Sequence, residues 1–235
     1  MERFGIDGDT FDWQATGLQW FRGRYRFELC YRGKRLGRAQ MKLPGRHNVM
    51  NGLAAAALAY HAGADVDAIL RAMATFSGVG RRMELKGVSR GITVVDDYGH
   101  HPTEIQASLR AIRDTYEPAR LWVVFQPHQH SRTRFLMADF ARSFALADVT
   151  LVPDIYFVRD SEAEKQAVSA EDLVSEIRRA GGDAHYLKSF EDIVEKLSAE
   201  LRPGDCLVTM GAGSVYEIAD RILRRLSEAA GAAGT

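Results

Sequence analysis

The chain has few cysteines, few prolines and no long apolar segment. Two of its 235 residues are cysteine and six are proline. Two cysteines cannot build a disulfide framework or a zinc site made mainly of cysteine, which fits a reduced, cytoplasmic setting. No apolar run reaches the roughly 18 residues that a membrane span needs. The amino terminus also lacks the basic and apolar segments of a signal peptide.

Neither sign of charge is in excess. Lysine plus arginine and aspartate plus glutamate each number 31, so the formal net charge is +0. This balance removes the argument for bulk attraction to nucleic acid or to an anionic membrane. Hydrophobic residues make up 46% and charged residues 26%, which is typical of a globular protein with a core. We therefore expect one large domain or two small ones.

The pattern of apolar residues changes near residue 80. Before it, residues 25–31 alternate apolar with polar side chains and residues 36–43 return after a turn, which predicts a β-hairpin. An alanine-rich helix with Asn48 as its cap is expected to run to His61. A second helix is expected over residues 66–76. We place the domain boundary just after residue 80.

From residue 91 onward, short apolar strands alternate with amphipathic helices. Strands are expected at 92–96, 121–125, 148–152, 184–187 and 206–210, and helices at 103–116, 133–145, 170–180, 190–201 and 215–229. Such strands, joined through helices, form a mostly parallel sheet with helices on both faces. The sequence thus predicts an α/β protein: a Rossmann-like part over 81–235, preceded by a partial α/β part with the hairpin. Residues 229–235 are expected to be frayed.

Polar residues gather after three of these strands, where parallel α/β sheets bind ligands. The three segments are Asp96-Asp97-Tyr98-Gly99-His100-His101-Pro102, the run from Phe125 to Arg134, and Gly211-Ala212-Gly213. The first is dense in titratable groups, and the second offers Arg132 and Arg134 to an anion. The alternatives are ordinary turn and cap hydrogen bonds for the first two and a tight glycine turn for the third.

Four of the seven histidines, His100, His101, His128 and His130, lie in these segments. Imidazole is a common metal ligand, so a histidine–metal hydrolase is one alternative. Adjacent histidines usually point apart and the nearby arginines repel a cation, which argues against it.

Two further pairs could reach a ligand. Asn48 and Asn51 share one helix face, where two carboxamides can pair with a heterocycle edge or a ribose. A cap and a surface asparagine are the alternative. Arg81 and Arg82 follow a glycine-containing loop and could reach phosphates from a hinge, although an isolated pair of arginines would simply be solvated.

Taken together, these segments resemble the Mur ligases, the ATP-dependent amino-acid ligases of peptidoglycan synthesis, over about residues 4–223. The resemblance is carried by five strings: Gly45–Asn51, Gly80–Arg82, Asp96–Glu104, Phe125–His128 and Asp154–Tyr156. The combination of Asp-Asp-Tyr-Gly-His-His-Pro with Phe-Gln-Pro-His is similar to the alanine-adding branch of the family.

The resemblance implies that residues 1–80 are the carboxyl-terminal part of the family's central ATP-binding domain. Residues 81–235 would then be its C-terminal Rossmann-like domain. The phosphate-binding pattern Gly-x-x-x-x-Gly-Lys-Ser/Thr does not occur, because Gly33-Lys34 is followed by Arg35. We therefore expect a fragment that is inactive alone, with the family's magnesium ligands in the missing part and no metal ligand in this chain.

For the whole enzyme, the resemblance implies a cytoplasmic ligase that joins L-alanine to UDP-N-acetylmuramate with ATP and Mg²⁺. ATP would convert the carboxylate of the sugar nucleotide to an acyl phosphate, which the amine of alanine attacks. Magnesium and basic side chains would offset the charge that accumulates. Such a reaction serves cell-wall biogenesis, and with it cell shape and cell division.

By the same resemblance, five residues bind the nucleotide. Asn48 and Asn51 would line the adenine pocket, and Arg82 would reach the phosphates. Asp97 would bind the ribose hydroxyls with Tyr98 beside it. Arg81 and Asp96, the first residue of each doublet, are secondary candidates for nucleotide binding.

Three residues are predicted to be catalytic. His128 and Arg132 would hold the alanine carboxylate and the reacting acyl group, where a cation suits an anionic substrate. His100 would lie beside the ribose-binding group. Two positions depart from the family: Gln129 stands where arginine is common, and Ser214 where aspartate is usual.

Two alternatives belong to other classes of protein. The chain could be a non-catalytic nucleotide or amino-acid binding module, or a subunit that completes a ligase in trans. The expected partners are the two substrates and either a missing amino-terminal portion or a second copy of the chain, with no nucleic acid and no membrane.

Overall fold

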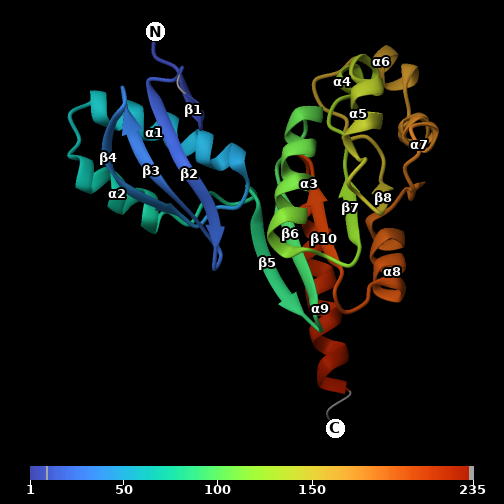
Figure 1. The fold of residues 1–235 in the computed structure, drawn as a ribbon. Coiled ribbons are helices and arrows are strands. Elements are labelled where there is room, and N and C mark those ends of the chain that lie inside the picture. The colour runs from blue at the N-terminus through green and yellow to red at the C-terminus, as the bar shows by residue number, and fades with distance from the viewer. Residues whose placement is uncertain (9, 233–235) are drawn as a thin grey trace. The chain divides into compact units, whose positions relative to one another are not determined.

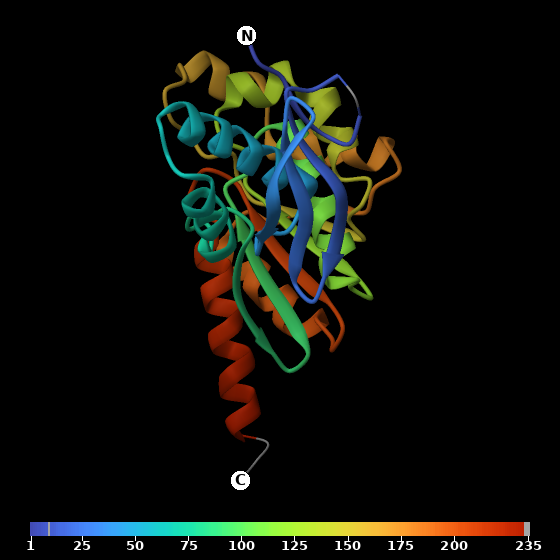
Figure 2. The ribbon, with the colours of Figure 1, turned by 60° about the vertical axis from the view of Figure 1, so that its left-hand side comes forward.

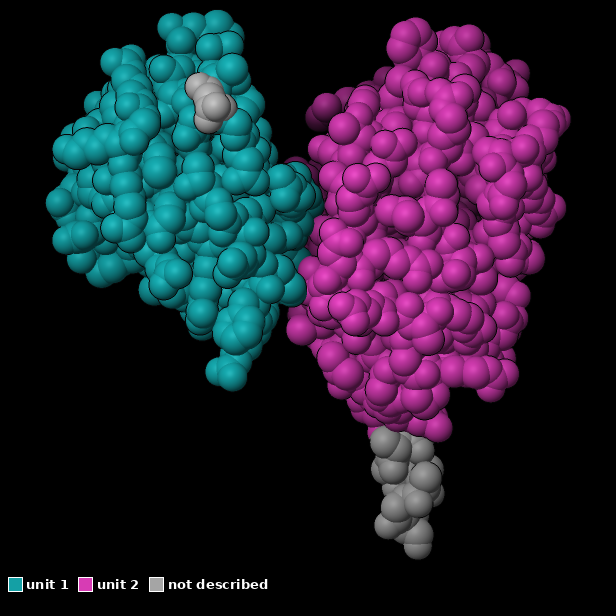
Figure 3. All heavy atoms as spheres, viewed as in Figure 1, with its two compact units in different colours: residues 1–78 teal, residues 79–235 magenta. Residues whose placement is uncertain are grey.

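The computed structural model describes residues 1–8 and 10–232, which form two compact units (Figure 3). Unit 1 is Met1–Gly78 and unit 2 is Val79–Thr235. This division falls two residues before the boundary predicted at residue 80. Each unit has its own sheet and its own hydrophobic core.

Unit 1 consists of a four-stranded sheet and two helices. Its elements are β1 (Phe4–Ile6), β2 (Trp13–Phe21), β3 (Arg24–Tyr31), β4 (Lys34–Met41), α1 (Arg46–His61) and α2 (Val66–Thr75). β1 pairs parallel with β2, and the other neighbours pair antiparallel. The predicted hairpin is β3–β4. Its turn residues Arg32 and Gly33 have φ values of 47° and 75°, as a two-residue hairpin turn requires.

The start of α1 differs from the prediction. The helix begins at Arg46 and the preceding residue is Gly45, whose φ of 90° stops the helix from extending further back. Asn48 therefore lies inside the first turn and is not the cap. Its Nδ2 donates to the carbonyl of Pro44 at 2.7 Å. α2 ends at Thr75, one residue earlier than predicted.

Unit 2 contains a six-stranded sheet in the order β5-β6-β10-β7-β8-β9, in which β5 is antiparallel and the rest are parallel. The strands are β5 (Glu84–Ser89), β6 (Ile92–Asp97), β7 (Leu121–Phe125), β8 (Val149–Val152), β9 (Ala184–Tyr186) and β10 (Cys206–Met210). The helices are α3 (Pro102–Tyr116), α4 (His130–Phe135), α5 (Met137–Ser143), α6 (Glu162–Ala167), α7 (Ala170–Arg179), α8 (Phe190–Glu200) and α9 (Tyr216–Ala232). The predicted α/β fold is confirmed.

Helices cover both faces of this sheet (Figure 1). On one face, α3, α5 and α7 pack in a core with Val123 and Phe125 of β7. On the other face, α8 and α9 pack in a second core with Trp122 and Val124. Because successive strand residues point to opposite faces, the continuous apolar run of β7 supplies both cores. This is the reason why the central strands could be recognised in the sequence.

Three elements of unit 2 differ from the predictions. β5 and α6 were not predicted, and the helix expected over 133–145 is two short helices interrupted at Leu136. The segment expected to fray is helical as far as residue 232, and residues 233–235 lie outside the described part of the chain. Within the described ranges, none of the helices is long and apolar enough to cross a membrane.

Candidate functional site

Four connecting segments of unit 2 meet at one edge of its sheet. β6, β10 and β7 are adjacent and parallel, so their carboxyl ends lie side by side. β5 runs antiparallel to β6, with Glu84 opposite Asp96, so the segment that enters β5 lies at the same edge (Figure 2). Residues 79–83, which we call the hinge segment, thus lie beside the loops that follow β6, β7 and β10. Open α/β sheets bind ligands at this edge.

Strand β5, which follows the hinge segment, was not predicted from the sequence. Residues 84–89 have only Leu85 and Val88 as large apolar residues, and the pairing register shifts between Leu85 and Gly87. The signal lay in the turn instead. Arg90 and Gly91 both have positive φ, 51° and 74°, as in a two-residue hairpin. An Arg-Gly pair directly before an apolar run was the available cue.

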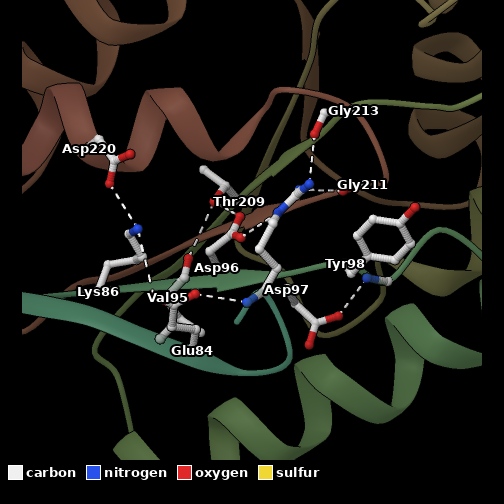
Figure 4. A network of polar contacts seen from close by, with 12 residues as sticks. Glu84, Lys86, Val95, Asp96, Asp97, Tyr98, Thr209, Gly211, Gly213 and Asp220 are labelled. Carbon is white, nitrogen blue, oxygen red and sulfur yellow. Dashed lines mark hydrogen bonds and ion pairs between the residues drawn. The ribbon is translucent and has the colours of Figure 1, made fainter. Parts of the chain in front are cut away.

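The aspartate doublet at the end of β6 is divided between the two faces of the sheet, because neighbouring strand residues point to opposite sides. Asp96 is fully buried. It accepts hydrogen bonds from Thr209 Oγ1 at 2.6 Å and from Arg81 Nε at 2.9 Å (Figure 4). Burial raises the pKa of the Asp96 carboxyl above its ordinary value, and these two hydrogen bonds oppose the rise. Both oxygens are therefore used within the protein.

Asp97 joins the hinge segment to the loop after β6. Its Oδ2 accepts from the backbone N–H of Met83 at 2.8 Å, and its Oδ1 accepts from that of Gly99 at 2.6 Å. Burial raises the pKa of this carboxyl, while the two backbone hydrogen bonds lower it. An ionised carboxylate accepts about four hydrogen bonds in all. Asp97 thus retains acceptor capacity beyond its structural bonds.

The arginine doublet is divided as well. Arg81 points into the protein, where its Nη1 donates to the carbonyl of Gly213 at 2.9 Å and its Nη2 to that of Gly211 at 2.6 Å. Its guanidinium carbon also lies 5.2 Å from the Tyr98 ring and 4.7 Å from the Tyr216 ring. The sequence left open whether this arginine is solvated. In the structure, its side chain instead binds Asp96 and the two glycine carbonyls within unit 2.

Arg82 is the accessible member of the pair. Its side chain is 52% exposed, and its Nη1 lies 4.0 Å from Glu104 Oε1. The guanidinium carbon is 5.2 Å from the centroid of the Tyr98 ring. Arg82 therefore has an exposed cation that is placed over an aromatic ring and can approach a ligand.

Four rings form a row along this edge. The ring centroids of Tyr98 and His100 are 5.4 Å apart, those of His100 and His128 are 6.5 Å apart, and those of His128 and Tyr156 are 5.5 Å apart. The last two rings are stacked, with 15° between their planes. Nδ1 of His100 lies 3.5 Å from Glu104 Oε2. The structure thus brings the predicted residues Tyr98, His100 and His128 together and adds Tyr156 and Glu104, for which no role was predicted.

Unused polar atoms lie at the His128 end of the row. Nδ1 of His128 and Nη1 of Arg132 are buried and have no hydrogen-bond partner among the described residues. Burial lowers the pKa of His128 below its ordinary value, and the positive charge of Arg132 adds to this. His128 is therefore mainly neutral near neutral pH. A neutral imidazole beside a guanidinium with a free N–H is suited to binding a carboxylate.

The helix that carries Arg132 is held by a residue that was not predicted. α4 begins at His130, three residues before the predicted start. Asp160 accepts from the backbone N–H of His130 at 2.5 Å and from Ser131 Oγ at 2.6 Å. Gln129 precedes the helix with a φ of 73° and makes no side-chain cap bond. Asp160, which lies outside the helix, therefore caps the start of α4.

The Gly211-Ala212-Gly213 segment is a tight turn packed against β7. Gly211 has a φ of 141°, and a Cβ there would lie 2.6 Å from the carbonyl oxygen of Gln126. A Cβ on Gly213 would lie 2.6 Å from Gln126 Oε1. The glycines thus allow two loops to approach closely. The carbonyls of both glycines accept hydrogen bonds from Arg81. This agrees with the glycine-turn interpretation.

The predicted adenine-binding pair lies in unit 1. Nδ2 of Asn51 donates to Oδ1 of Asn48 at 3.4 Å, so the two carboxamides share one helix face as their spacing predicts. Asn48 is buried and Asn51 is exposed.

The histidines do not form a metal site in the described part of the chain. No three His, Cys, Asp or Glu side chains among residues 1–8 and 10–232 are grouped so that they could hold a metal ion. His101 caps α3 by accepting from Thr103 N at 3.3 Å. The histidine–metal hydrolase interpretation therefore lacks a site here.

Comparison with known proteins identifies close relatives. The UDP-N-acetylmuramate–L-alanine ligase of Caldanaerobacter subterraneus is 42% identical over 221 residues, which is 94% of this chain and 47% of the relative. That of Solibacter usitatus is 47% identical over 201 residues, 85% of this chain and 42% of the relative. This chain thus spans about half the length of the curated relatives it matches.

Solved structures of two ligases have a similar fold. The crystal structure of the UDP-N-acetylmuramate–alanine ligase of Thermotoga maritima matches with a TM-score of 0.78 and 24% identity, over 95% of this chain and 48% of that chain. A murein peptide ligase of Psychrobacter arcticus matches with a TM-score of 0.66 and 28% identity, over 96% and 46%. Residues 81–213, more than half of the chain, match the family described as "Mur ligase, glutamate ligase domain". These residues include both doublets, the four rings and Arg132, and the protein belongs to the Mur ligase family.

Proposed function

We propose that this chain forms the part of an ATP-dependent ligase that binds nucleotide and amino acid, in an enzyme that joins L-alanine to UDP-N-acetylmuramate. One observation carries the proposal: an exposed arginine, a ribose-compatible carboxylate and a histidine–arginine pair lie along one edge of the sheet in unit 2. The names of relatives that are 42% and 47% identical support the choice of reaction. The reaction consumes ATP, so we propose a cytoplasmic setting and a role in cell-wall growth, shape and division.

The nucleotide-binding half would use the hinge segment and the loop after β6. The exposed guanidinium of Arg82 matches the charge and geometry of phosphate oxygens. The remaining lone pairs of Asp97 can accept from ribose hydroxyls without breaking its bonds to Met83 and Gly99. Tyr98 would support Arg82 through its ring face. Asn48 and Asn51 of unit 1 would pair with the adenine edge.

The amino-acid half would use the loop after β7. Arg132 and neutral His128 each have an unused, buried polar atom, and together they can bind the carboxylate of L-alanine. His100 would accept the proton that the alanine ammonium must lose, and Glu104 would stabilise the resulting imidazolium. The amine nitrogen then forms a bond to the acyl carbon. The carbon–oxygen bond to phosphate breaks, phosphate leaves with the electron pair, and the second proton of the nitrogen passes to the departing phosphate.

ATP would supply the phosphoryl group that converts the substrate carboxylate to an acyl phosphate. The resemblance also implies Mg²⁺. Residues 1–8 and 10–232 bring together no group of three His, Cys, Asp or Glu ligands, so we assign no metal ligand and no metal-dependent step to this chain.

Calorimetric titration of the purified chain with ADP tests the proposal. We expect ADP to bind, and Arg82→Gln to weaken ADP binding by about tenfold, because one charge-assisted contact to phosphate is lost. Arg134→Gln is the matched control, since Arg134 is an exposed arginine that pairs with Glu164 at 3.0 Å on another part of unit 2. A folded chain that binds no ADP would contradict the proposal.

A second assay separates the proposal from its alternatives. With ATP, UDP-N-acetylmuramate and L-alanine, we expect the chain alone to release no phosphate, since the phosphate-binding glycine–lysine pattern does not occur in its sequence. Phosphate release on addition of the amino-terminal half of a relative would support a part of a ligase. ADP binding without any such complementation would support a binding module instead.

A further inference from the structure

We infer that Arg81 is a positioning residue of the nucleotide site: it fixes the backbone that directs Arg82, and it does not contact the nucleotide itself. The inference deepens the proposed function and rests on it for the nucleotide. Its structural half depends only on contacts within unit 2.

Arg81 has little capacity left for a ligand. Three of its five N–H donors are used, one each on Asp96, Gly211 and Gly213. Tyr98 and Tyr216 lie near its guanidinium at 5.2 Å and 4.7 Å. Its side chain is 23% exposed, against 52% for Arg82. To reach a phosphate, Arg81 would have to abandon a carboxylate that is fully buried, and that charge would lose its partner.

The backbone around Arg82 is held in an unusual conformation. Arg81 has a φ of 60° and Met83 a φ of 51°, so Arg82 lies between two residues in the left-handed region, which side chains with a Cβ disfavour. Such a conformation persists only where its surroundings impose it. The direction of the Arg82 side chain therefore depends on whatever holds Arg81 and Met83.

Several contacts hold this conformation, and most of them involve Arg81. Its N–H donates to Glu84 Oε2 at 2.8 Å, and its carbonyl accepts from the N–H of Tyr98 at 2.6 Å. The N–H of Met83 is bound by Asp97. The Arg81 side chain adds the remaining contacts, to Asp96 of β6 and to the two glycine carbonyls after β10.

One guanidinium thus joins three segments of the site edge: the hinge segment, the end of β6 and the glycine turn. Asp96 is also bound by Thr209, which lies on β10 just before that turn (Figure 4). Within this network, the positive charge of Arg81 is matched by the negative charge of Asp96. A lysine could keep the charge but has no planar fork to reach both carbonyls and the carboxylate.

The test compares Arg81→Lys with the unsubstituted chain. Amide hydrogen exchange is measured at Tyr98 and Met83. Thr93 is the internal reference, because it lies at the opposite end of β6 and its N–H donates to the carbonyl of Asp205. We expect exchange at Tyr98 and Met83 to rise by about tenfold with no change at Thr93, as in local opening. We also expect ADP affinity to fall by about tenfold while adenosine affinity is unchanged, because the displaced Arg82 serves the phosphates alone.

Arg82→Gln is the matched control, and we expect it to lower ADP affinity without changing exchange at Tyr98 or Met83. Unchanged exchange in Arg81→Lys would overturn the inference, and so would equal losses of ADP and adenosine affinity. If Arg81→Lys does not fold, Asp96→Asn keeps the size of the side chain and removes its charge. We expect it to show the same pattern at smaller amplitude, and unchanged exchange there would likewise overturn the inference. If the unsubstituted chain binds no ADP, the proposed function fails, while the exchange measurement still decides whether Arg81 holds this backbone.

Discussion

Arg81 and Tyr98 are joined through both backbone and side chain. The carbonyl of Arg81 accepts from the N–H of Tyr98 at 2.6 Å, and its guanidinium carbon lies 5.2 Å from the Tyr98 ring. The ring of Tyr98 is also 5.2 Å from the guanidinium carbon of Arg82. The hinge segment and the loop after β6 therefore form one connected structure, and the exposed Arg82 is part of it.

Replacing the buried Asp97 with asparagine should destabilise the chain. An asparagine offers one acceptor oxygen where two backbone N–H groups, those of Met83 and Gly99, need acceptors. One buried donor would face the amide NH₂, which costs about 1–3 kcal/mol. Urea unfolding of Asp97→Asn measures this loss. The control is Asp154→Asn, because Asp154 is exposed and its carboxylate accepts from Tyr186 OH. Equal stability of the two variants would refute the structural role of Asp97.

The two glycines after β10 should differ in their tolerance of a methyl group. Gly211→Ala places a Cβ 2.6 Å from a backbone carbonyl at a φ of 141°, whereas in Gly213→Ala the neighbour at 2.6 Å is the end of the Gln126 side chain. A side chain can move more easily than a backbone. We expect Gly211→Ala to cost about 1–3 kcal/mol more in free energy of unfolding. Urea unfolding of both variants gives the comparison, and the reverse order would show that the turn is packed differently.

Unit 1 contains a carboxylate whose pKa makes stability depend on pH. Hydrogen bonds from Tyr31 OH, His61 Nε2 and Trp13 Nε1 lower the pKa of Glu2 from 4.5 to about 2. The folded state therefore keeps Glu2 ionised where the unfolded chain takes up a proton. Its stabilising contribution is complete above pH 4.5 and is lost as the pH falls toward about 2.

The variant Glu2→Gln tests this dependence. We expect it to lower the free energy of unfolding near neutral pH and to make the decline between about pH 4.5 and pH 3 shallower. Glu162→Gln is the control, because Glu162 is exposed and lies 3.9 Å from Lys165 of the same helix, α6 of unit 2. Identical acid profiles for the unsubstituted chain and Glu2→Gln would contradict the prediction.

The histidine of the proposed amino-acid site should titrate below its ordinary range. Burial lowers the pKa of His128, and the charge of Arg132 lowers it further. The unfolded chain then binds the proton more tightly, so the contribution to stability is complete above about pH 6.5 and declines as the pH falls below it. NMR titration of the His128 ring should show its pKa rising in Arg132→Gln. An unchanged pKa would mean that the guanidinium does not act on this ring.

Binding of L-alanine gives a separate test of the same pair. We expect L-alanine to bind in the presence of ADP, and L-alaninol, which has no carboxylate, to bind at least about tenfold more weakly. Arg132→Gln should remove the difference between the two ligands. Competition calorimetry measures both affinities, and equal affinity in the unsubstituted chain would place the carboxylate elsewhere.

The strands and the loops could be predicted because their signals are local. The apolar run from Leu121 to Phe125 supplies two cores at once, and no surface segment would have that composition. The polar residues after β6 and β7 could be recognised because they lie close together in the sequence. β5 escaped because its apolar content is low, and its evidence lay in the Arg90-Gly91 turn.

The division of labour within the doublets could not be predicted locally. Arg81 and Arg82, like Asp96 and Asp97, are equivalent in the sequence. Their roles separate because β10 inserts between β6 and β7, which brings the glycine turn and Thr209 beside Asp96. That strand order depends on a connection of more than 100 residues between β6 and β10, from Asp97 to Cys206. Patterns among neighbouring residues therefore do not predict this strand order.

The most direct test of the account is a map of backbone amide NMR shifts in the chain as ADP is added. We predict that within unit 2 the largest changes fall on residues 82–83 and 97–100, and that Arg82→Gln reduces them. Changes centred on other parts of unit 2, or no change in a chain with a dispersed, folded spectrum, would contradict the claim that this edge of the sheet binds nucleotide.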